Sequence, residues 1–449
     1  MALYPTGRFH VGRQCGSRRN RSFQKLVLVQ MVSNAKQWRG RPIEHTKDYD
    51  LAVIEFDDQG WYQDLGQRNE FERFLHEKVE QDEHLLIVVF IHGWKHNAAA
   101  DDTSLRSFRG VLRDARFSED RRSDERGRDR KILGVYLSWR GLSLSGNELW
   151  TNASFWTRKK AADKVAVGSI REILARLRAF QIARNKTNDH EGPDEGTRLI
   201  VSGHSFGGLI LFAAVSEYLI ESVVGRTFLG GSGKRIVRPF GDLVILINPA
   251  FEAARYLPLY AAVQAQPGYP KNQRACFLAV TATNDSATGY WFPFGRWLNT
   301  RLESVRRNAL TPWLRDDAQH PPPDAEKQAV CNTIGHLPWL LTHRLSCAKT
   351  EESAHQAYKG KGLIDWRKER QDFDEFNQKY RRDGHLQNNW KRTFTSGAIL
   401  EHVRGSPDCP FWMIQATPEV VDGHNGIFRP VFLDFLRQLC DDRLHHIDC

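Results

Sequence analysis

The stretch TRLIVSGHSFGGLILFAAV, residues 197–215, contains the strongest structural signal in the chain. An apolar run leads into Gly-His-Ser-Phe-Gly, and an apolar run rich in small residues leads out of it. This pattern predicts a strand, a sharp turn with Ser205 at its apex, and a helix. Gly203 and Gly207 suit such a turn, because a side chain at either position would collide with the neighbouring element.

The Gly-x-Ser-x-Gly pattern alone is a weak signal. It arises by chance in about one chain in ten of this length, given how common its residues are. The flanking apolar runs strengthen it, because a serine at the apex of a strand-to-helix turn has its hydroxyl lifted clear of the sheet and can act as a nucleophile. The alternative is an ordinary glycine-rich turn with a buried serine.

Continuous apolar runs alternate with helical patterns along the rest of the chain. Besides the strand before Ser205, strands are expected at residues 49–56, 85–91, 132–139, 243–250, 276–283 and 411–418. Helices are expected at 69–81, 103–117, 159–185, 366–382 and 427–440, with a charged loop at 118–131. Strands that are apolar throughout are buried on both faces, so this order predicts an α/β fold: a mainly parallel central sheet with helices on both faces.

The charge of the chain and its distribution bear on the partners and the location that the protein can have. The chain has 449 residues and a formal net charge of +10. Residues 1–43 contain several arginines and no acidic residue, and we interpret them as a basic, disordered arm; the alternative is an organelle transit peptide. Such an arm permits weak contact with an anionic surface, but it predicts no specific nucleic-acid partner. No apolar run approaches the length of a membrane-spanning helix.

The seven cysteines are scattered and show no CxxC or Cys/His metal spacing. Reduced thiols and a cytoplasmic location are therefore expected, with no metal and no cofactor.

The segment around Ser205 resembles the nucleophile turn of the α/β-hydrolase superfamily, in particular its serine esterases and lipases. The resemblance extends over residues 49–439, although its specific residues lie in four short segments. It implies an α/β-hydrolase fold in which a serine, an acid and a histidine follow in that order, each just after a strand. The implied organisation is a core of residues 44–285 and 409–449, interrupted at residues 286–408 by an aromatic-rich cap or lid.

Asp285 is the acid that this order implies, because it is the first carboxylate after the strand CFLAVTAT. Glu252, after the preceding strand, is a weaker candidate. The sequence around Asp285 is also favourable for a turn, so a capping role is the alternative.

His424, in the segment VVDGHNGIF, is the implied base. It follows the last predicted strand and precedes the closing helix, a setting that the other histidines lack. Its neighbour Asp422 is a further candidate for an acid or a supporting group.

The segment FIHGWKHN, residues 90–97, resembles the His-Gly loop of lipases and esterases. The resemblance implies that the backbone N–H groups of Phe206 and Trp94 bind the oxyanion, with His92 and Gly93 forming the supporting turn. Trp94 departs from the glycine-rich form of that loop. A metal site at His92 and His96 is the alternative, although their spacing on a loop does not place them on one face.

Together these residues predict a serine hydrolase that cleaves a carboxylic ester through Ser205, His424 and Asp285 and an acyl-enzyme. The expected partner is a small-molecule or lipid ester. Amide or thioester cleavage would use the same residues, so both remain open. The other alternative is a catalytically silent binding protein with a hydrolase fold.

Overall fold

The computed structural model describes residues 40–445 apart from 95, 127–129, 140–147, 187–195, 230–236, 238–239, 272, 294–323 and 349–365. Most of the predicted basic arm falls on residues 1–39 and lies outside the described residues. Ile43, the predicted last residue of that arm, instead begins the first strand.

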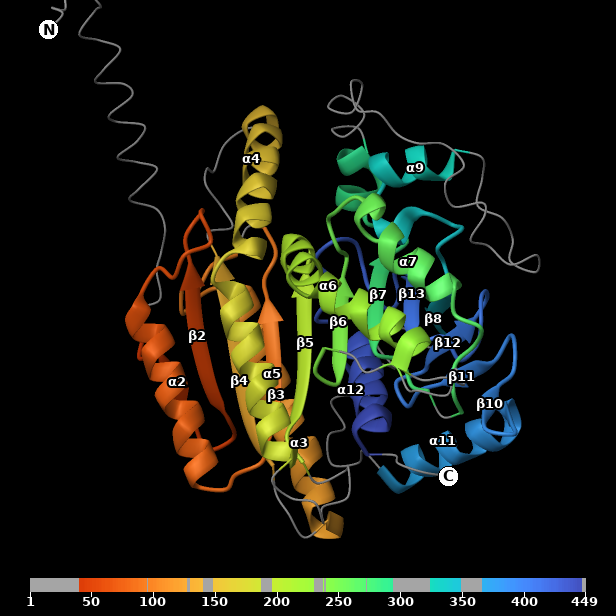
Figure 1. The fold of residues 1–449 in the computed structure, drawn as a ribbon, viewed down its shortest axis with the longest axis horizontal. Helices are drawn as coiled ribbons and strands as arrows, with labels where there is room; N and C mark the ends of the chain where they lie inside the picture. Colours follow the sequence, from red (N-terminus) through yellow and green to blue (C-terminus); the bar gives the residue numbers. More distant parts are fainter. Residues whose placement is uncertain are drawn as a thin grey trace, which may run out of the picture.

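Within the described residues, eleven strands form one sheet in the order β1-β2-β4-β3-β5-β6-β7-β13-β8-β12-β11 (Figure 1). Neighbours from β2 to β8 are parallel, whereas β1 at one edge and β12 and β11 at the other are antiparallel. The strands are β1 Ile43–His45, β2 Asp50–Phe56, β3 Leu85–Ile91, β4 Lys131–Trp139, β5 Arg198–His204, β6 Leu243–Ile247, β7 Phe277–Ala282, β8 His343–Cys347, β11 Lys391–Thr393, β12 Ala398–His402 and β13 Phe411–Ala416. A separate hairpin pairs β9 Arg381–Arg382 with β10 His385–Leu386.

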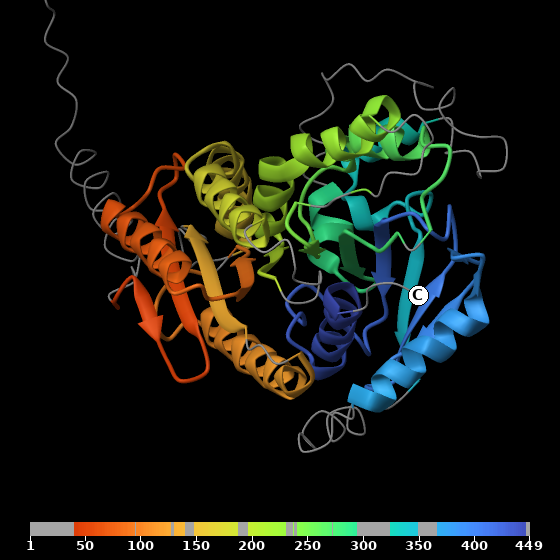
Figure 2. The same ribbon diagram turned by 60° about the horizontal axis from the view of Figure 1, so that its bottom comes forward.

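Helices cover both faces of the sheet (Figure 2). One face carries α2 Leu65–Glu80, α4 Glu148–Val167, α5 Ile170–Lys186, α6 Phe206–Leu229 and α7 Leu257–Gln264, and α9 Ala325–Cys331 joins the same core. The other face carries α3 Thr103–Arg126, α11 Trp366–Tyr380 and α12 Pro430–His445. Along β3, the side chains of Ile87 and Val89 pack into the hydrophobic core on the first face of the sheet. Those of Leu86 and Phe90 pack into the core on the other face. The α/β class and the mostly parallel sheet are therefore confirmed.

The single helix predicted over residues 159–185 is wrong, because the chain forms α4 and α5 with a break at Gly168 and Ser169. A Cβ atom on Gly168 would lie 2.3 Å from the carbonyl oxygen of Gly60. The amide of Ser169 donates to that same oxygen at 2.7 Å. The close approach to the Gly60 backbone thus ends one helix and begins the next, which the sequence pattern does not reveal.

The charged loop predicted at residues 118–131 is also wrong over much of its length, because α3 continues to Arg126. Glu119, on this continuation, pairs with Arg130 at 3.3 Å, and both side chains are only 2% exposed. A run of charges therefore includes a buried ion pair.

The predicted cap at residues 286–408 differs most from the structure, because part of it extends the central sheet. Strand β8 pairs with β13 in parallel and with β12 in antiparallel fashion. Leu345, Ala398 and Leu400 on these strands are buried in the core of that face. The sequence reading missed these strands because each is short and only half apolar. Two segments of the predicted cap, residues 294–323 and 349–365, lie outside the described residues.

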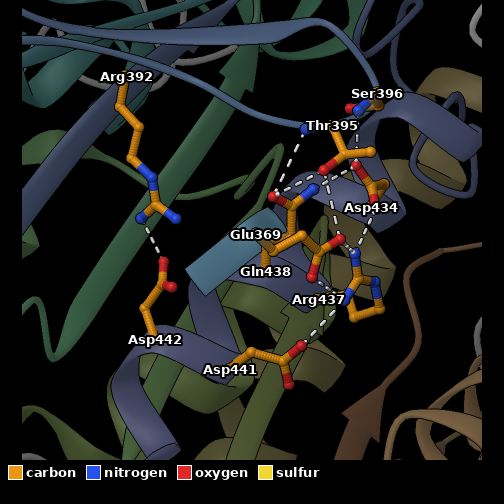
Figure 3. A network of polar contacts seen from close by, with 9 residues as sticks. All are labelled: Glu369, Arg392, Thr395, Ser396, Asp434, Arg437, Gln438, Asp441 and Asp442. Carbon is orange, nitrogen blue, oxygen red and sulfur yellow. Dashed lines mark hydrogen bonds and ion pairs between the residues drawn. The ribbon is translucent and has the colours of Figure 1, made fainter. Parts of the chain in front are cut away.

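A polar network ties this sheet extension to the closing helix α12 (Figure 3). The guanidinium of Arg437 donates to Asp441 at 2.9 Å and to Asp434 at 2.8 Å. It also donates to Glu369 on α11, at 2.5 Å. Burial raises the pKa of the Glu369 carboxyl, although Arg437 opposes this shift. The Arg437 guanidinium, whose side chain is 13% exposed, thus binds three buried carboxylates from two helices.

We predict that Arg437→Met lowers the free energy of unfolding by about 3–5 kcal/mol, because it leaves buried carboxylates without their cation. Urea denaturation measures this loss, with Arg106→Met on the exposed side of α3 as the control. Equal stability of the two variants would contradict the importance of the network.

Helix α6 is the most apolar helix of the core. Residues Phe206–Gly225 are long and apolar enough to cross a membrane, judged by length and composition alone. Half of that window is buried inside the protein, and the core helix of a soluble protein passes the same test. This helix therefore does not decide where the protein resides.

The five cysteines among the described residues are free thiols: Cys276, Cys331, Cys347, Cys409 and Cys440.

Candidate active site

Ser205 occupies the turn between β5 and α6 with a backbone φ of 56°, in the left-handed region that side chains disfavour. Its amide donates to the carbonyl of Ile247 on β6 at 2.9 Å. A Cβ atom on Gly203 would lie 2.5 Å from the carbonyl oxygen of Gly207. A Cβ atom on Gly207 would lie 2.0 Å from the carbonyl oxygen of Ile91 on β3. Both glycines are therefore required, and Gly207 is required because of a neighbouring strand.

The chain changes direction in the sheet beside this turn. From β3 it moves outward to β4, and it then crosses back to β5 on the other side of β3. The helices after β3 and β5 consequently lie on opposite faces of the sheet. In open α/β sheets, such a switch point leaves a crevice at the carboxyl ends of the strands, where ligands bind.

The three residues predicted to act together do meet at these strand ends. The Nε2 atom of His424 lies 2.8 Å from the hydroxyl oxygen of Ser205. The Nδ1 atom of the same ring lies 2.8 Å from Oδ2 of Asp285. Ser205 follows β5, Asp285 follows β7 and His424 follows β13, so three separate loops form one hydrogen-bonded line.

The hydrogen bonds define the proton positions along this line. Burial raises the pKa of Asp285, but the hydrogen bonds from His424 and Thr288 outweigh it and leave that pKa below its usual value. An ionised carboxylate only accepts, so the Nδ1–H group of His424 donates to it. With the Nδ1 proton in this position, a neutral imidazole has a free lone pair at Nε2, which can accept from the Ser205 hydroxyl. This is the arrangement in which a histidine can take a proton from a serine.

Asp285 also fulfils the capping role that its sequence suggested. Its Oδ1 atom accepts from the amides of Ala287 at 3.0 Å and Thr288 at 3.2 Å, at the start of the short helix η2 Ala287–Trp291. The other oxygen, Oδ2, faces His424. The capping role and the contact with His424 therefore use different oxygens of the same carboxylate.

The other acid candidates have different partners. Glu252 forms ion pairs with Lys159 at 2.9 Å and with Arg255 at 3.1 Å. The carboxylate of Asp422 accepts from Asn284 at 2.8 Å. The structure thus brings Asp285 to His424, whereas the carboxylates of Glu252 and Asp422 contact other residues.

The loop that carries His424 is held by residues that the sequence reading missed. His204 Nε2 donates to the backbone carbonyl of His424 at 2.8 Å. Asn248 Nδ2 donates to the same carbonyl at 2.9 Å and to that of Gly423 at 3.1 Å. Burial lowers the pKa of His204 to about 3, so its ring is neutral and serves as a donor. His204 ends β5 and Asn248 directly follows β6, and a polar residue near the end of a predicted strand was the available signal.

The predicted His-Gly loop lies directly against the nucleophile turn. A Cβ atom on Gly93 would lie 2.9 Å from Cβ of Ser205 and 2.8 Å from Nδ1 of His204. Trp94 follows Gly93 at this contact, and Phe206 begins α6. The amides of the first turn of a helix have no acceptor within that helix, so the Phe206 N–H belongs to a turn suited to an anion.

His92 supports this loop from inside the protein. Its Nε2 atom accepts from the Trp139 amide at 3.1 Å, so the Nδ1–H group donates to the carbonyl of Gly93 at 2.8 Å. Burial lowers the pKa of His92 to about 4. Both ring nitrogens therefore have protein partners, which disfavours the alternative of a metal site with His96. No group of three His, Cys, Asp or Glu side chains suited to a metal ion occurs in the described part of the chain.

Aromatic side chains surround the start of α6. Phe155 on α4 lies 4.8 Å from Phe206 and 5.5 Å from Trp94, measured between ring centroids. Phe292, just after η2, lies 6.4 Å from Phe155. The aromatic surroundings of the site thus come largely from α4 and the His-Gly loop, which precede Ser205 in the chain, and only partly from the predicted cap.

Comparison of the chain with protein-family models, with curated proteins and with solved structures finds no match in any of the three. What the site can do must therefore be inferred from its geometry and chemistry.

We predict that stability falls as the pH drops below 6.5, because the buried rings of His92 and His204 stay neutral in the folded protein while the unfolded chain takes up protons. The loss should develop between pH 6.5 and about 4, the range between the ordinary pKa and that of folded His92. Each histidine contributes up to about 1.4 kcal/mol per pH unit. Denaturant titrations between pH 7 and 5 measure the slope. His92→Gln should reduce it by about one proton, and an unchanged slope would contradict the assignment.

Proposed function

We propose that the chain is a serine hydrolase with an α/β-hydrolase fold that cleaves a carboxylic ester. The observation that carries this proposal is the line of hydrogen bonds from Ser205 Oγ through His424 to Asp285, with 2.8 Å at each step. A serine hydroxyl is a poor nucleophile at neutral pH and needs an oriented base beside it. The left-handed turn at Ser205 and the order of the three residues along the chain further support the fold.

In the proposed reaction, the Ser205 oxygen attacks the acyl carbon while its proton passes to Nε2 of His424. Asp285 stabilises the imidazolium that forms. The resulting tetrahedral oxyanion accepts hydrogen bonds from the backbone N–H groups of Phe206 and Trp94. His424 then donates its proton to the leaving alcohol, which leaves an acyl-enzyme on Ser205. A water molecule, deprotonated by His424, attacks this ester. His424 then returns the proton to the Ser205 oxygen as the carboxylic acid leaves.

The aromatic surroundings favour an apolar acyl group. Trp94, Phe155 and Phe206 lie beside the serine turn, where the acyl carbon must sit. An apolar chain gains free energy by leaving water for such a surface. Ser205 is only 2% exposed. Amide and thioester bonds would react through the same residues, and they are the second candidate for the scissile bond.

We predict that Ser205→Ala abolishes hydrolysis of p-nitrophenyl esters, because it removes the nucleophile, and lowers kcat by a factor of about 10⁴ or more. Ser222→Ala is the matched control, since Ser222 lies on the same helix and its hydroxyl donates to the carbonyl of Leu219. Release of p-nitrophenol measures turnover, and circular dichroism checks the fold.

A fluorophosphonate probe separates an enzyme from a silent binding protein. The proposal expects covalent labelling at Ser205, located by mass spectrometry, and loss of labelling in His424→Gln. Turnover by Ser205→Ala equal to that of the unaltered protein, or labelling that persists in Ser205→Ala, would refute the proposal.

The apolar acyl site makes a separate prediction. Phe155→Ala should lower kcat/KM for a p-nitrophenyl octanoate ester about tenfold while changing the acetate ester little, since a factor of ten corresponds to about 1.4 kcal/mol of lost apolar contact. Equal effects on the two esters would argue against acyl binding beside Phe155.

A further inference from the structure

The hydrogen-bonded line does not end at Asp285. The hydroxyl oxygen of Thr288 lies 2.6 Å from Oδ2 of Asp285 and 2.9 Å from Nε2 of His336. Thr288 belongs to η2, and His336 belongs to the short helix η4 Ile334–His336. Both therefore come from the region after Asp285 that was expected to be a cap. The proposed reaction assigns neither residue a role.

The direction of each proton follows from the chemistry of the groups. An ionised carboxylate only accepts, so the Thr288 hydroxyl donates its single proton to Asp285. The Thr288 oxygen can then only accept from His336, whose Nε2–H group must be the donor. Burial lowers the pKa of His336, so the ring is neutral and this hydrogen bond sets its tautomer. Each of the two hydrogen bonds from His336 through Thr288 to Asp285 therefore has one donor and one acceptor.

His336 lies in a closely fitted position. A Cβ atom on Gly289 would lie 3.0 Å from Cε1 of the His336 ring. A Cβ atom on Gly335 would lie 1.8 Å from the Thr281 hydroxyl oxygen on β7, so the backbone beside His336 contacts the sheet directly. Thr288 is only 1% exposed. Close packing of this kind fixes where both side chains can lie.

Few charges other than those of the site lie near His336. Helix η4 packs against β7, against β13 and against the short helix η1 Ala253–Arg255. Strands β7 and β13, with the sequences FLAVTA and FWMIQA, contain no titratable side chain. On η1, Arg255 pairs with Glu252 and Asp163. Among the described residues, Asp285 and His424 are accordingly the charged or titratable groups that act on the His336 ring.

We propose that Thr288 and His336 are positioning residues that fix the carboxylate of Asp285 for His424, an inference that rests on the proposed function. The amides of Ala287 and Thr288 donate to Oδ1, and the Thr288 hydroxyl donates to Oδ2. With these contacts made, Oδ2 stays directed at Nδ1 of His424. His336 donates to one lone pair of the Thr288 oxygen and thereby orients the hydroxyl so that its proton points to Asp285.

Paired variants test this role. Thr288→Val keeps the shape of the side chain and removes the hydroxyl, whereas Thr288→Ser keeps the hydroxyl. We expect Thr288→Val to lower kcat about tenfold with KM unchanged, the size of effect expected for one hydrogen bond to a charged group. Thr288→Ser should remain close to the unaltered protein. His336→Gln, which retains an N–H donor, should likewise be more active than His336→Phe.

A second readout does not depend on turnover. The Nδ1–H proton of His424, hydrogen-bonded to Asp285, should give a low-field proton NMR signal that is absent in His424→Gln. Thr288→Val should shift or broaden this signal, and Thr288→Ser should restore it. Such a shift without ester hydrolysis by the unaltered protein would refute the proposed function and leave the positioning role standing.

An unshifted signal together with unchanged kcat in Thr288→Val would overturn the positioning role. Equal losses in Thr288→Val and Thr288→Ser would also overturn it, because the hydroxyl would then not matter. Thermal denaturation identifies any variant that does not fold. If Thr288→Val does not fold, the comparison of His336→Gln with His336→Phe decides the question by the same two measurements.

Discussion

The strained backbone of Ser205, with its φ of 56°, is the constraint on which the rest of the site depends. A side chain in this conformation costs free energy, so the surrounding structure has to hold it in place. It does so through the hydrogen bond from the Ser205 amide to Ile247 and through the close approach of Gly207 to Ile91. The turn is therefore fixed by β3 and β6, the neighbours of its own strand on either side.

The same strand ends position the base and the acid. His204 and Asn248, which end or follow β5 and β6, donate to the backbone of the His424 loop. Asn248 also accepts from the amide of Ala282, at the end of the strand that leads to Asp285. These contacts link adjacent parallel strands and connect the three loops of the site to one another. A buried neutral histidine, His92, holds the fourth loop in a similar way.

Much of the site could be predicted because its main residues follow recognisable local patterns. Ser205 and Asp285 come shortly after apolar runs, and His424 lies in the loop between the last predicted strand and the closing helix. Parallel strands bring such positions to one edge of the sheet. Thr288 and His336 had no comparable signal, because their hydrogen bonds depend on the packing of η4 against β7. Strands β8 and β12 were missed for a related reason: short, half-apolar segments become strands only when a neighbouring strand pairs with them.

Local sequence patterns were thus enough for the α/β class, the buried parallel strands and the turn at Ser205, since these depend on apolar periodicity and on glycine near a tight turn. The break between α4 and α5, the sheet extension and the second set of hydrogen bonds to Asp285 required the tertiary structure. Each of these arises from atoms far apart in the chain, such as Gly60 beside Gly168, or Gly335 beside Thr281. Contacts of this kind depend on how close two backbones come, and a single sequence does not encode that distance in any local pattern.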